Sequence, residues 1–264
     1  MPRVLAVANQ KGGVGKTTTA VSVASNLALS GQRTLLIDLD PQGNASTALG
    51  FSSKSVEVSS YNVVVQQLPI SAARVTTSVE KLDLLPATMD LAGAEIELVP
   101  MFSRELRLRS AISLVEKDYD YILIDCPPSL GLLTINSLAA ASEVLVPLQC
   151  EYYALEGLSQ LLSNVQLVQD ALNPDLNVSA IVLVMFDART RLAQEVAEEV
   201  RAHFGDLVLT AVVPRSVRLS EAPSYGQPIE IYDPESAGAA AYRAVTKEIF
   251  AQKLNDLALS ERSP

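Results

Sequence analysis

The sequence predicts an α/β protein in which helices cover both faces of a doubly wound, mostly parallel β-sheet. Its apolar runs are short and nearly continuous, as in parallel strands that are buried on both faces. Longer segments with helical spacing separate these runs, and such alternation implies right-handed crossover connections. At 264 residues, 48% of them hydrophobic, the chain can bury one large core, so we expect a single domain over residues 1–264.

The individual elements follow from the apolar pattern along the chain. Strands are predicted at residues 4–8, 34–39, 121–125, 144–148, 179–185 and 207–213. Helices are predicted at residues 17–30, 104–117, 155–172, 189–204 and about 235–258. Gly31 and Gly205 are natural helix stops after the first and fourth of these. The less regular segment 51–100 should hold short helices and an edge hairpin.

Composition excludes several classes of protein. No apolar run approaches the roughly 18 uncharged residues of a membrane span, and the chain starts directly with a strand-like stretch, so we expect a cytoplasmic protein without a signal peptide. Cys126 and Cys150 are too few for a disulfide framework and form no Cys-x-x-Cys pair, which predicts buried small hydrophobes. The net charge of −10 disfavours generic binding of polyanions, so any nucleic acid must contact a local basic patch.

The stretch QKGGVGKTTT, residues 10–19, predicts a phosphate-binding loop between a strand and a helix. Its glycines let backbone N–H groups close around phosphate oxygens at the helix N-terminus, where the helix dipole favours anions. Lys16 should neutralise the β- and γ-phosphates, and the Thr17 hydroxyl should bind Mg²⁺. The candidate nucleotide-binding residues of this loop are Lys11, Gly12, Gly13, Val14, Gly15, Lys16, Thr17 and Thr18. The alternative is a Gly/Lys-rich turn without chemical meaning.

Acidic residues end two of the predicted strands. Asp38 and Asp40 close TLLIDLD, and Asp125 closes YILID. Ligands of open parallel sheets gather at these carboxyl ends, and Mg²⁺ needs oxygen ligands there. Asp125, followed by CPPS, matches a Walker-B carboxylate that acts on Mg²⁺ through a water. Each aspartate alone is also explained as an N-cap of a loop or helix.

Five stretches together resemble the ParA/Soj branch of the deviant Walker-A ATPases: KGGVGKTTT, LIDLDPQGNAST, YILIDCPPSLG, MFDARTRL and VPRSVRLSEAPSYGQPI. They are spread from residue 10 to about residue 230, so the resemblance covers nearly the whole chain. It implies a P-loop NTPase fold and Mg²⁺-dependent hydrolysis of ATP to ADP and phosphate. The short start resembles the small Soj-like members, which lack an N-terminal helix-turn-helix domain.

The resemblance also implies roles for particular residues. Lys11 corresponds to the family's signature lysine, which reaches across an ATP-sandwich dimer to the partner's phosphates; the alternative is a lysine that only solvates the loop. Asp40 aligns with the residue that positions the attacking water, and Asp38 with a carboxylate nearer the metal. Pro214 and Ser216 align with the adenine contact, although relatives often carry Asn at the second position.

Basic side chains recur in the last third of this acidic chain, at Arg189, Arg218, Arg243 and Lys247. In Soj-like relatives, arginines at positions that match Arg189 and Arg218 contribute to sequence-independent DNA binding by the ATP dimer. Scattered surface arginines are otherwise usually only solvated. The resemblance therefore implies an ATP-dependent homodimer that binds double-stranded DNA in the nucleoid and is reset by a ParB-like activator.

Three other kinds of protein share parts of this pattern. A membrane-positioning ATPase of the MinD kind relies on a C-terminal basic amphipathic helix, and this chain ends LNDLALSERSP without a cluster of cations. A reductase resembling the nitrogenase iron protein needs a cysteine pair that bridges a dimer, for which Cys126 is badly placed. A metabolic ATP-dependent ligase or synthetase should require a small acceptor molecule for its activity, whereas the switch needs DNA and a protein activator.

Overall fold

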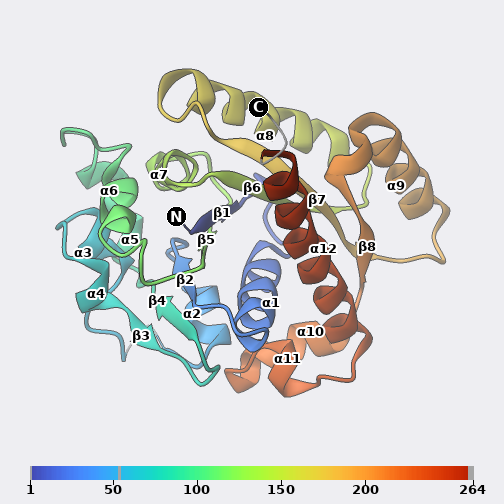
Figure 1. The fold of residues 1–264 in the computed structure, drawn as a ribbon, viewed down its shortest axis with the longest axis horizontal. Helices are drawn as coiled ribbons and strands as arrows, with labels where there is room; N and C mark the ends of the chain where they lie inside the picture. The colour runs from blue at the N-terminus through green and yellow to red at the C-terminus, as the bar shows by residue number, and fades with distance from the viewer. Residues whose placement is uncertain (1, 53–54, 261–264) are drawn as a thin grey trace.

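The centre of the molecule is an eight-stranded β-sheet with the strand order β3-β4-β2-β5-β1-β6-β7-β8 (Figure 1). The computed structural model describes residues 2–52 and 55–260, and of residues 252–260 the helical backbone only. The strands are β1 Arg3–Val7, β2 Thr34–Asp38, β3 Val75–Thr76, β4 Leu82–Leu85, β5 Tyr121–Asp125, β6 Glu143–Gln149, β7 Asn177–Phe186 and β8 Val208–Pro214. All neighbouring strands are parallel except β3 and β4, which pair antiparallel at the edge.

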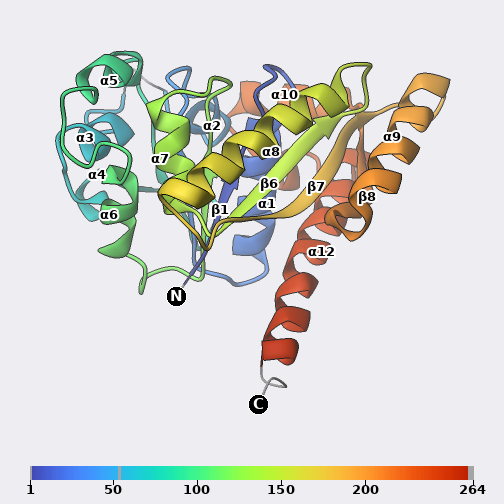
Figure 2. The same cartoon turned by 90° about the horizontal axis from the view of Figure 1, so that it is seen from above.

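Helices and short helical turns connect the strands. The helices are α1 Lys16–Leu29, α2 Asn44–Ala48, α3 Ser60–Val64, α4 Ile70–Ala73, α5 Leu91–Glu97, α6 Arg107–Ser113, α7 Leu132–Ala140, α8 Ala154–Ala171, α9 Arg191–Phe204, α10 Val217–Glu221, α11 Ile229–Tyr232 and α12 Ala237–Ser260. Two 3-10 turns, η1 Gly205–Leu207 and η2 Ala222–Tyr225, complete the set. The last part of α12 projects beyond the body of the molecule (Figure 2).

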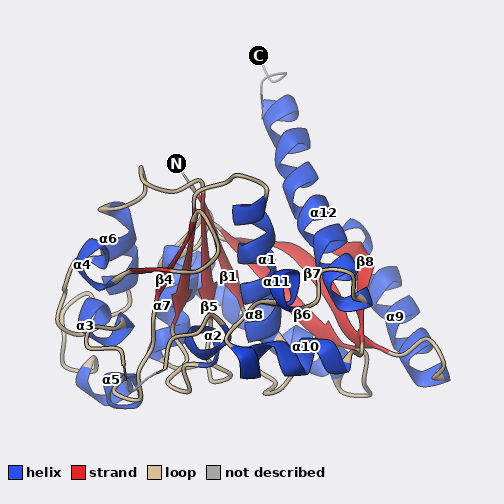
Figure 3. Cartoon of the chain, turned by 90° about the horizontal axis from the view of Figure 1, so that it is seen from below, coloured by secondary structure: helices blue, strands red, loops and turns tan. Residues whose placement is uncertain are grey.

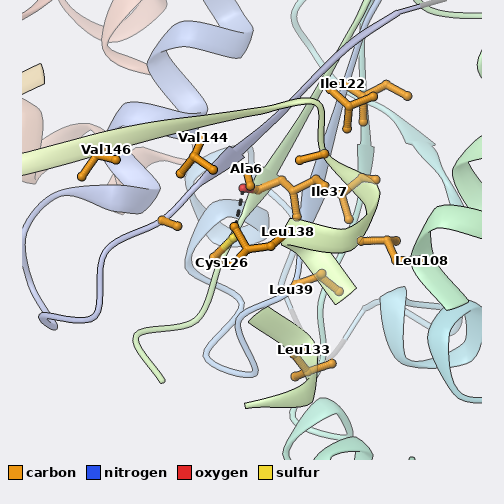
Figure 4. Packing of buried hydrophobic residues seen from close by; sticks show 14 of the residues in the cluster. Ala6, Ile37, Leu39, Leu108, Ile122, Cys126, Leu133, Leu138, Val144 and Val146 are labelled. Atoms are coloured by element: carbon orange, nitrogen blue, oxygen red, sulfur yellow. Dashed lines mark hydrogen bonds between the residues drawn. The ribbon is translucent and has the colours of Figure 1, made fainter. Parts of the chain in front are cut away.

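Each face of the sheet packs against its own set of helices (Figure 3). Buried residues of α1, α2, α11 and α12 form one hydrophobic cluster with the strands, and those of α3 to α9 form the other. Figure 4 shows part of the second cluster, in which side chains from β1, β2, β5 and β6 meet those of α6 and α7. Because both faces are covered, successive strand residues are all buried, which explains the continuous apolar runs.

The structure confirms the predicted fold class, and each of the six predicted strands is present. The edge hairpin expected within residues 51–100 is formed by β3 and β4. Two helix predictions were too long: α6 spans only Arg107–Ser113, and α9 begins at Arg191 and not at Arg189. The Asp187 carboxylate accepts hydrogen bonds from the backbone and guanidinium of Arg189, which holds that residue in the turn before α9.

Burial of both cysteines confirms their predicted role as small core side chains. Cys126 and Cys150 are free thiols, and burial raises the pKa of Cys126 to about 12 and that of Cys150 to about 11. No helix in residues 2–52 and 55–260 is long and apolar enough to cross a membrane. Of the C-terminal stretch LNDLALSERSP, residues 261–264 lie outside the described residues.

Candidate nucleotide site

The sheet brings the predicted site together at the carboxyl ends of its central strands. In the register of the sheet, Asp125 at the end of β5 lies beside Val7 of β1 and Asp38 of β2. The glycine-rich loop leaves β1 at this edge and leads directly into α1. Sequence segments more than a hundred residues apart therefore converge on one edge of the sheet.

The loop itself leaves the N-terminus of α1 open. Gly13 and Gly15 have φ angles of +74° and +77°, a left-handed conformation that side chains disfavour. Gly15 is the N-cap residue of α1, no side chain caps this terminus, and its first turn contains no acidic residue. The 14-residue helix therefore presents unpaired N–H groups and the positive end of its dipole to the space above the loop.

A cavity of about 460 Å³ lies above this helix end. Of the predicted residues, Gly12, Gly13, Gly15, Lys16, Thr17, Thr18 and Asp40 line it. The opposite wall comes from the distant segment 219–229, through Leu219, Ala222, Pro223, Gln227, Pro228 and Ile229. Its volume is in the range of small-molecule sites.

Lys16 lies beneath the loop, with only 6% of its surface exposed. Its Nζ donates a hydrogen bond of 3.1 Å to the backbone oxygen of Lys11. Burial lowers the pKa of Lys16, and the negative charge of Asp125 opposes this shift. A phosphate oxygen in the cavity would supply the anion that this largely buried lysine needs.

Asp125 is a fully buried carboxylate whose two oxygens have no hydrogen bond of ordinary geometry to any described residue. Burial, followed by the charge of Asp38, raises its pKa well above the usual range, while the nearby Thr17 hydroxyl lowers it. An acid left without partners is unusual in a native core and fits a cation bound between it and Thr17. No three His, Cys, Asp or Glu side chains in the described part of the chain form a metal cage, so Mg²⁺ would also need phosphate and water ligands.

Asp38, by contrast, already has its oxygens bound. It accepts hydrogen bonds from the backbone N of Ser46 at 2.8 Å, the Ser46 hydroxyl at 2.7 Å and the backbone N of Asp40 at 3.2 Å. Burial raises its pKa to about 6 despite these bonds. Asp38 thus holds α2 and Asp40 in place, and its assignment as a metal ligand stays a prediction.

Lys11 points away from its own cavity. Its Nζ forms an ion pair with Glu151, which follows β6, and its backbone N donates to Asn9 Oδ1 at 3.0 Å. The ion pair is about half exposed, so it is easily exchanged for another partner. Sequence reasoning did not anticipate Glu151, because the pair joins positions 140 residues apart.

The three remaining residues that were predicted to contact the nucleotide do not line the cavity. The Val14 side chain is buried beneath the loop, so only its backbone faces a ligand. Pro214 ends β8 and Ser216 is the N-cap of α10, and neither lines the cavity. The segment that follows them does so instead, and its closely spaced Pro223, Gly226 and Pro228 were the available signal of a shaped loop.

The predicted basic residues fall into two groups. Arg189 is bound to Asp187, whose pKa is lowered to about 2 by this contact, and Arg215 adds to the lowering. Arg218 pairs with Glu221 and Asp233. Arg189, Arg215 and Arg218 follow the ends of the neighbouring strands β7 and β8, and the sequence analysis did not single out Arg215. Arg243 and Lys247 line a second cavity beside α12.

Comparison with known proteins identifies close relatives. A family model described as an AAA domain matches residues 2–178. The sporulation initiation inhibitor protein Soj of Bacillus subtilis is 55% identical over 95% of this chain and 99% of its own length. The chromosome partitioning protein ParA of Myxococcus xanthus is 52% identical over 94% of this chain and 87% of its own length. A crystal structure described as cobyrinic acid a,c-diamide synthase of Mycobacterium smegmatis, with bound ADP and magnesium, is 42% identical with a TM-score of 0.82, covering 94% of this chain and 93% of that one.

Proposed function

Because the chain belongs to the ParA/Soj family of chromosome-partitioning ATPases, we propose that it is an ATP-driven switch that dimerises on ATP, binds DNA without sequence preference and is reset by a ParB-like activator. The observation that carries the proposal is the set formed by the open α1 N-terminus, buried Lys16 and the unpartnered Asp125. Such a set suits a magnesium-bound nucleoside triphosphate.

The chain's own residues have distinct tasks in this proposal. Backbone N–H groups of the loop and Lys16 hold the phosphates, and Thr17 with Asp125 would hold Mg²⁺, which neutralises charge on the phosphates when bound. Asp40, which lines the cavity, orients the attacking water. The relative from M. smegmatis, with ADP and magnesium bound, supports this use of the fold.

Lys11 acts on a second copy of the chain in this proposal. Its side chain is exposed, does not line its own cavity and forms an ion pair with Glu151. A lysine released from that pair can supply positive charge to the partner's phosphates, as an arginine finger does elsewhere. ATP then joins the two copies.

DNA binding is assigned to the exposed arginines that follow β7 and β8, with Arg243 and Lys247 as further contacts. The ion pairs of Arg189 and Arg218 with neighbouring carboxylates are exposed and therefore weak, so DNA phosphates can replace the carboxylates. A dimer doubles the number of contacts and makes binding depend on ATP. Localisation in the cytoplasm on the nucleoid follows from this activity.

DNA binding by these arginines can be tested by fluorescence anisotropy, with unrelated DNA duplexes, a series of salt concentrations and ATP present. The double variant Arg189→Glu, Arg218→Glu should weaken binding to every duplex and lower the salt slope by about one per lost contact. Arg33→Glu is the matched control, because Arg33 is also exposed and paired with a carboxylate but precedes β2, at the other end of the strands. Unchanged DNA affinity in the double variant would place the DNA site elsewhere.

The resemblance to the M. smegmatis structure keeps a synthase as the second candidate. ATP hydrolysis should be measured with DNA and a candidate ParB peptide, and separately with cobyrinic acid and an amide donor. Stimulation by DNA and peptide supports the switch. Turnover that requires the small acceptor would replace it with a synthase.

A further inference from the structure

A second cavity of about 520 Å³ is lined by residues of α1, α11 and α12 at the C-terminal end of α1. At a rise of 1.5 Å per residue, this end of α1 is about 20 Å from Lys16. The residues that line the cavity are Asn26, Leu27, Leu29, Ser30, Glu230, Arg243, Thr246, Lys247 and Phe250. None of them lines the nucleotide cavity.

Glu230 is the unexplained group in this cavity. It is only 6% exposed, and its Oε1 accepts a hydrogen bond of 2.8 Å from Asn26 Nδ2, whereas its Oε2 has no hydrogen-bond partner among the described residues. Burial raises the pKa of Glu230 to about 8, against the opposing charge of Arg243, so the carboxyl is mostly protonated at pH 7. Its hydroxyl then needs an acceptor that the surrounding side chains do not supply.

The rest of the cavity indicates which acceptor fits. Arg243 and Lys247 are exposed and lie one turn apart on α12, where they place two positive charges at the rim. Arg243 donates to the backbone oxygen of Pro234 at 2.7 Å, which fixes its position. Leu27, Leu29 and Phe250 contribute apolar surface beside these polar groups.

We propose that this cavity binds a small amphipathic organic anion, with its carboxylate between Glu230 and the two rim cations and its apolar chain against the leucine and phenylalanine side chains. An amine would be repelled by the rim cations, and a DNA backbone would touch the rim without reaching the buried carboxyl. The two cations also offset the negative end of the α1 dipole, since the last turn of α1 has no basic residue. That role leaves Glu230 Oε2 unpaired, whereas a carboxylate ligand pairs it once the Glu230 side chain, whose Oε2 is buried, turns toward the rim.

The first experiment titrates the intact protein with octanoate and with octylammonium, which share an eight-carbon chain and differ in charge. Calorimetry should show one octanoate site and no octylammonium binding. Arg243→Ala should weaken octanoate binding about tenfold, because a charge-assisted hydrogen bond is lost. Arg201→Ala, at an exposed arginine of α9, is the matched control and should keep full affinity. Equal binding of both ligands, no binding of octanoate at millimolar concentration, or unchanged affinity in Arg243→Ala would overturn the proposal.

A pH series gives a second, independent readout. Octanoate affinity should fall as the pH rises through about 8, since ionised Glu230 repels the carboxylate. The other ionisable groups near Glu230 are Arg243, Lys247 and Tyr242 of α12; burial raises the pKa of Tyr242, and α1 adds no ionisable side chain to the lining. Glu230→Gln keeps a donor of similar shape and should remove the pH dependence. A flat profile in the unaltered protein contradicts the assignment of Glu230.

Discussion

Helix α1 has a cavity at each end, and the chain builds these two cavities in different ways. At the N-terminal end, one contiguous loop supplies the phosphate donors and the lysine. At the C-terminal end, single side chains from α1, α11 and α12 meet only after folding. At the N-terminal end, the Lys16 ammonium lies near the free N–H groups of α1. At the C-terminal end, the protonated Glu230 carboxyl lies below Arg243 and Lys247. In the two proposals, one helix holds two anion sites of unlike design, of which only the contiguous one is evident in the sequence.

The most complete loss of function is expected from Lys16→Ala, which should break only the N-terminal site. The loop loses the charge directed at the β- and γ-phosphates, so ATP affinity should fall by about 100-fold or more, and ATP-dependent dimerisation with it. Light scattering during nucleotide titration measures both. Octanoate binding at the other end of α1 should stay unchanged and serves as the control for folding. An undiminished ATP-dependent dimer would remove Lys16 from this role.

Lys11→Ala sharpens the comparison between the two cavities. The nucleotide site is proposed to need Lys11 from a second copy of the chain, whereas the C-terminal cavity is complete within one copy. ATP affinity should survive, while hydrolysis should fall by about 1,000-fold, the lower range for a charge supplied in trans. Mixing Lys11→Ala with Asp40→Ala subunits should restore hydrolysis, since one site of the mixed dimer then has both residues. If the mixture is no more active than either variant alone, Lys11 acts within its own subunit.

Asp40→Ala should leave both cavities able to bind their ligands and slow only the chemical step. Loss of the group that orients water should reduce ATP hydrolysis by about 100-fold while the ATP dimer accumulates. Size-exclusion chromatography with ATP measures the dimer. A variant that elutes only as a monomer would show that Asp40 is a structural or metal-binding residue.

Glu230→Gln should have the smallest effect on ATP binding and hydrolysis and should act only through the C-terminal site. The pKa of Glu230 rises on folding from about 4.5 to about 8, so its contribution to stability is fully present below pH 4.5 and is lost as the pH rises to 8. The free energy of unfolding should therefore fall between pH 5 and pH 8, by at most roughly 1.4 kcal/mol per pH unit from this group. Thermal unfolding of Glu230→Gln should show a shallower decline, and Glu235→Gln, at an exposed neighbour, should match the unaltered protein. Equal slopes in all three would contradict the prediction.

The sheet could be predicted from sequence because each central strand is buried on both faces and is therefore continuously apolar. The phosphate loop could be predicted because it follows such a strand, and Asp125 because it is the last residue of one. Helix α7 was missed, since its residues LLTINSLAA are mostly buried and lack a polar stripe. The pairs Lys11–Glu151 and Asn26–Glu230 were also beyond sequence reasoning, because each joins positions more than a hundred residues apart.

The two walls of the nucleotide cavity have a consequence for the order in which the protein acquires its activity. The glycine-rich loop leaves the ribosome about 200 residues before the segment 219–229 that forms the opposite wall. At ordinary rates of synthesis this interval lasts about 10 to 40 s. Throughout it, the growing chain has the loop but lacks the part of the cavity lining that residues 219–229 supply, so it encloses a nucleotide less completely than the finished protein does. Full enclosure of the nucleotide, and any pairing of subunits that depends on it, therefore comes only when synthesis of the chain is nearly complete.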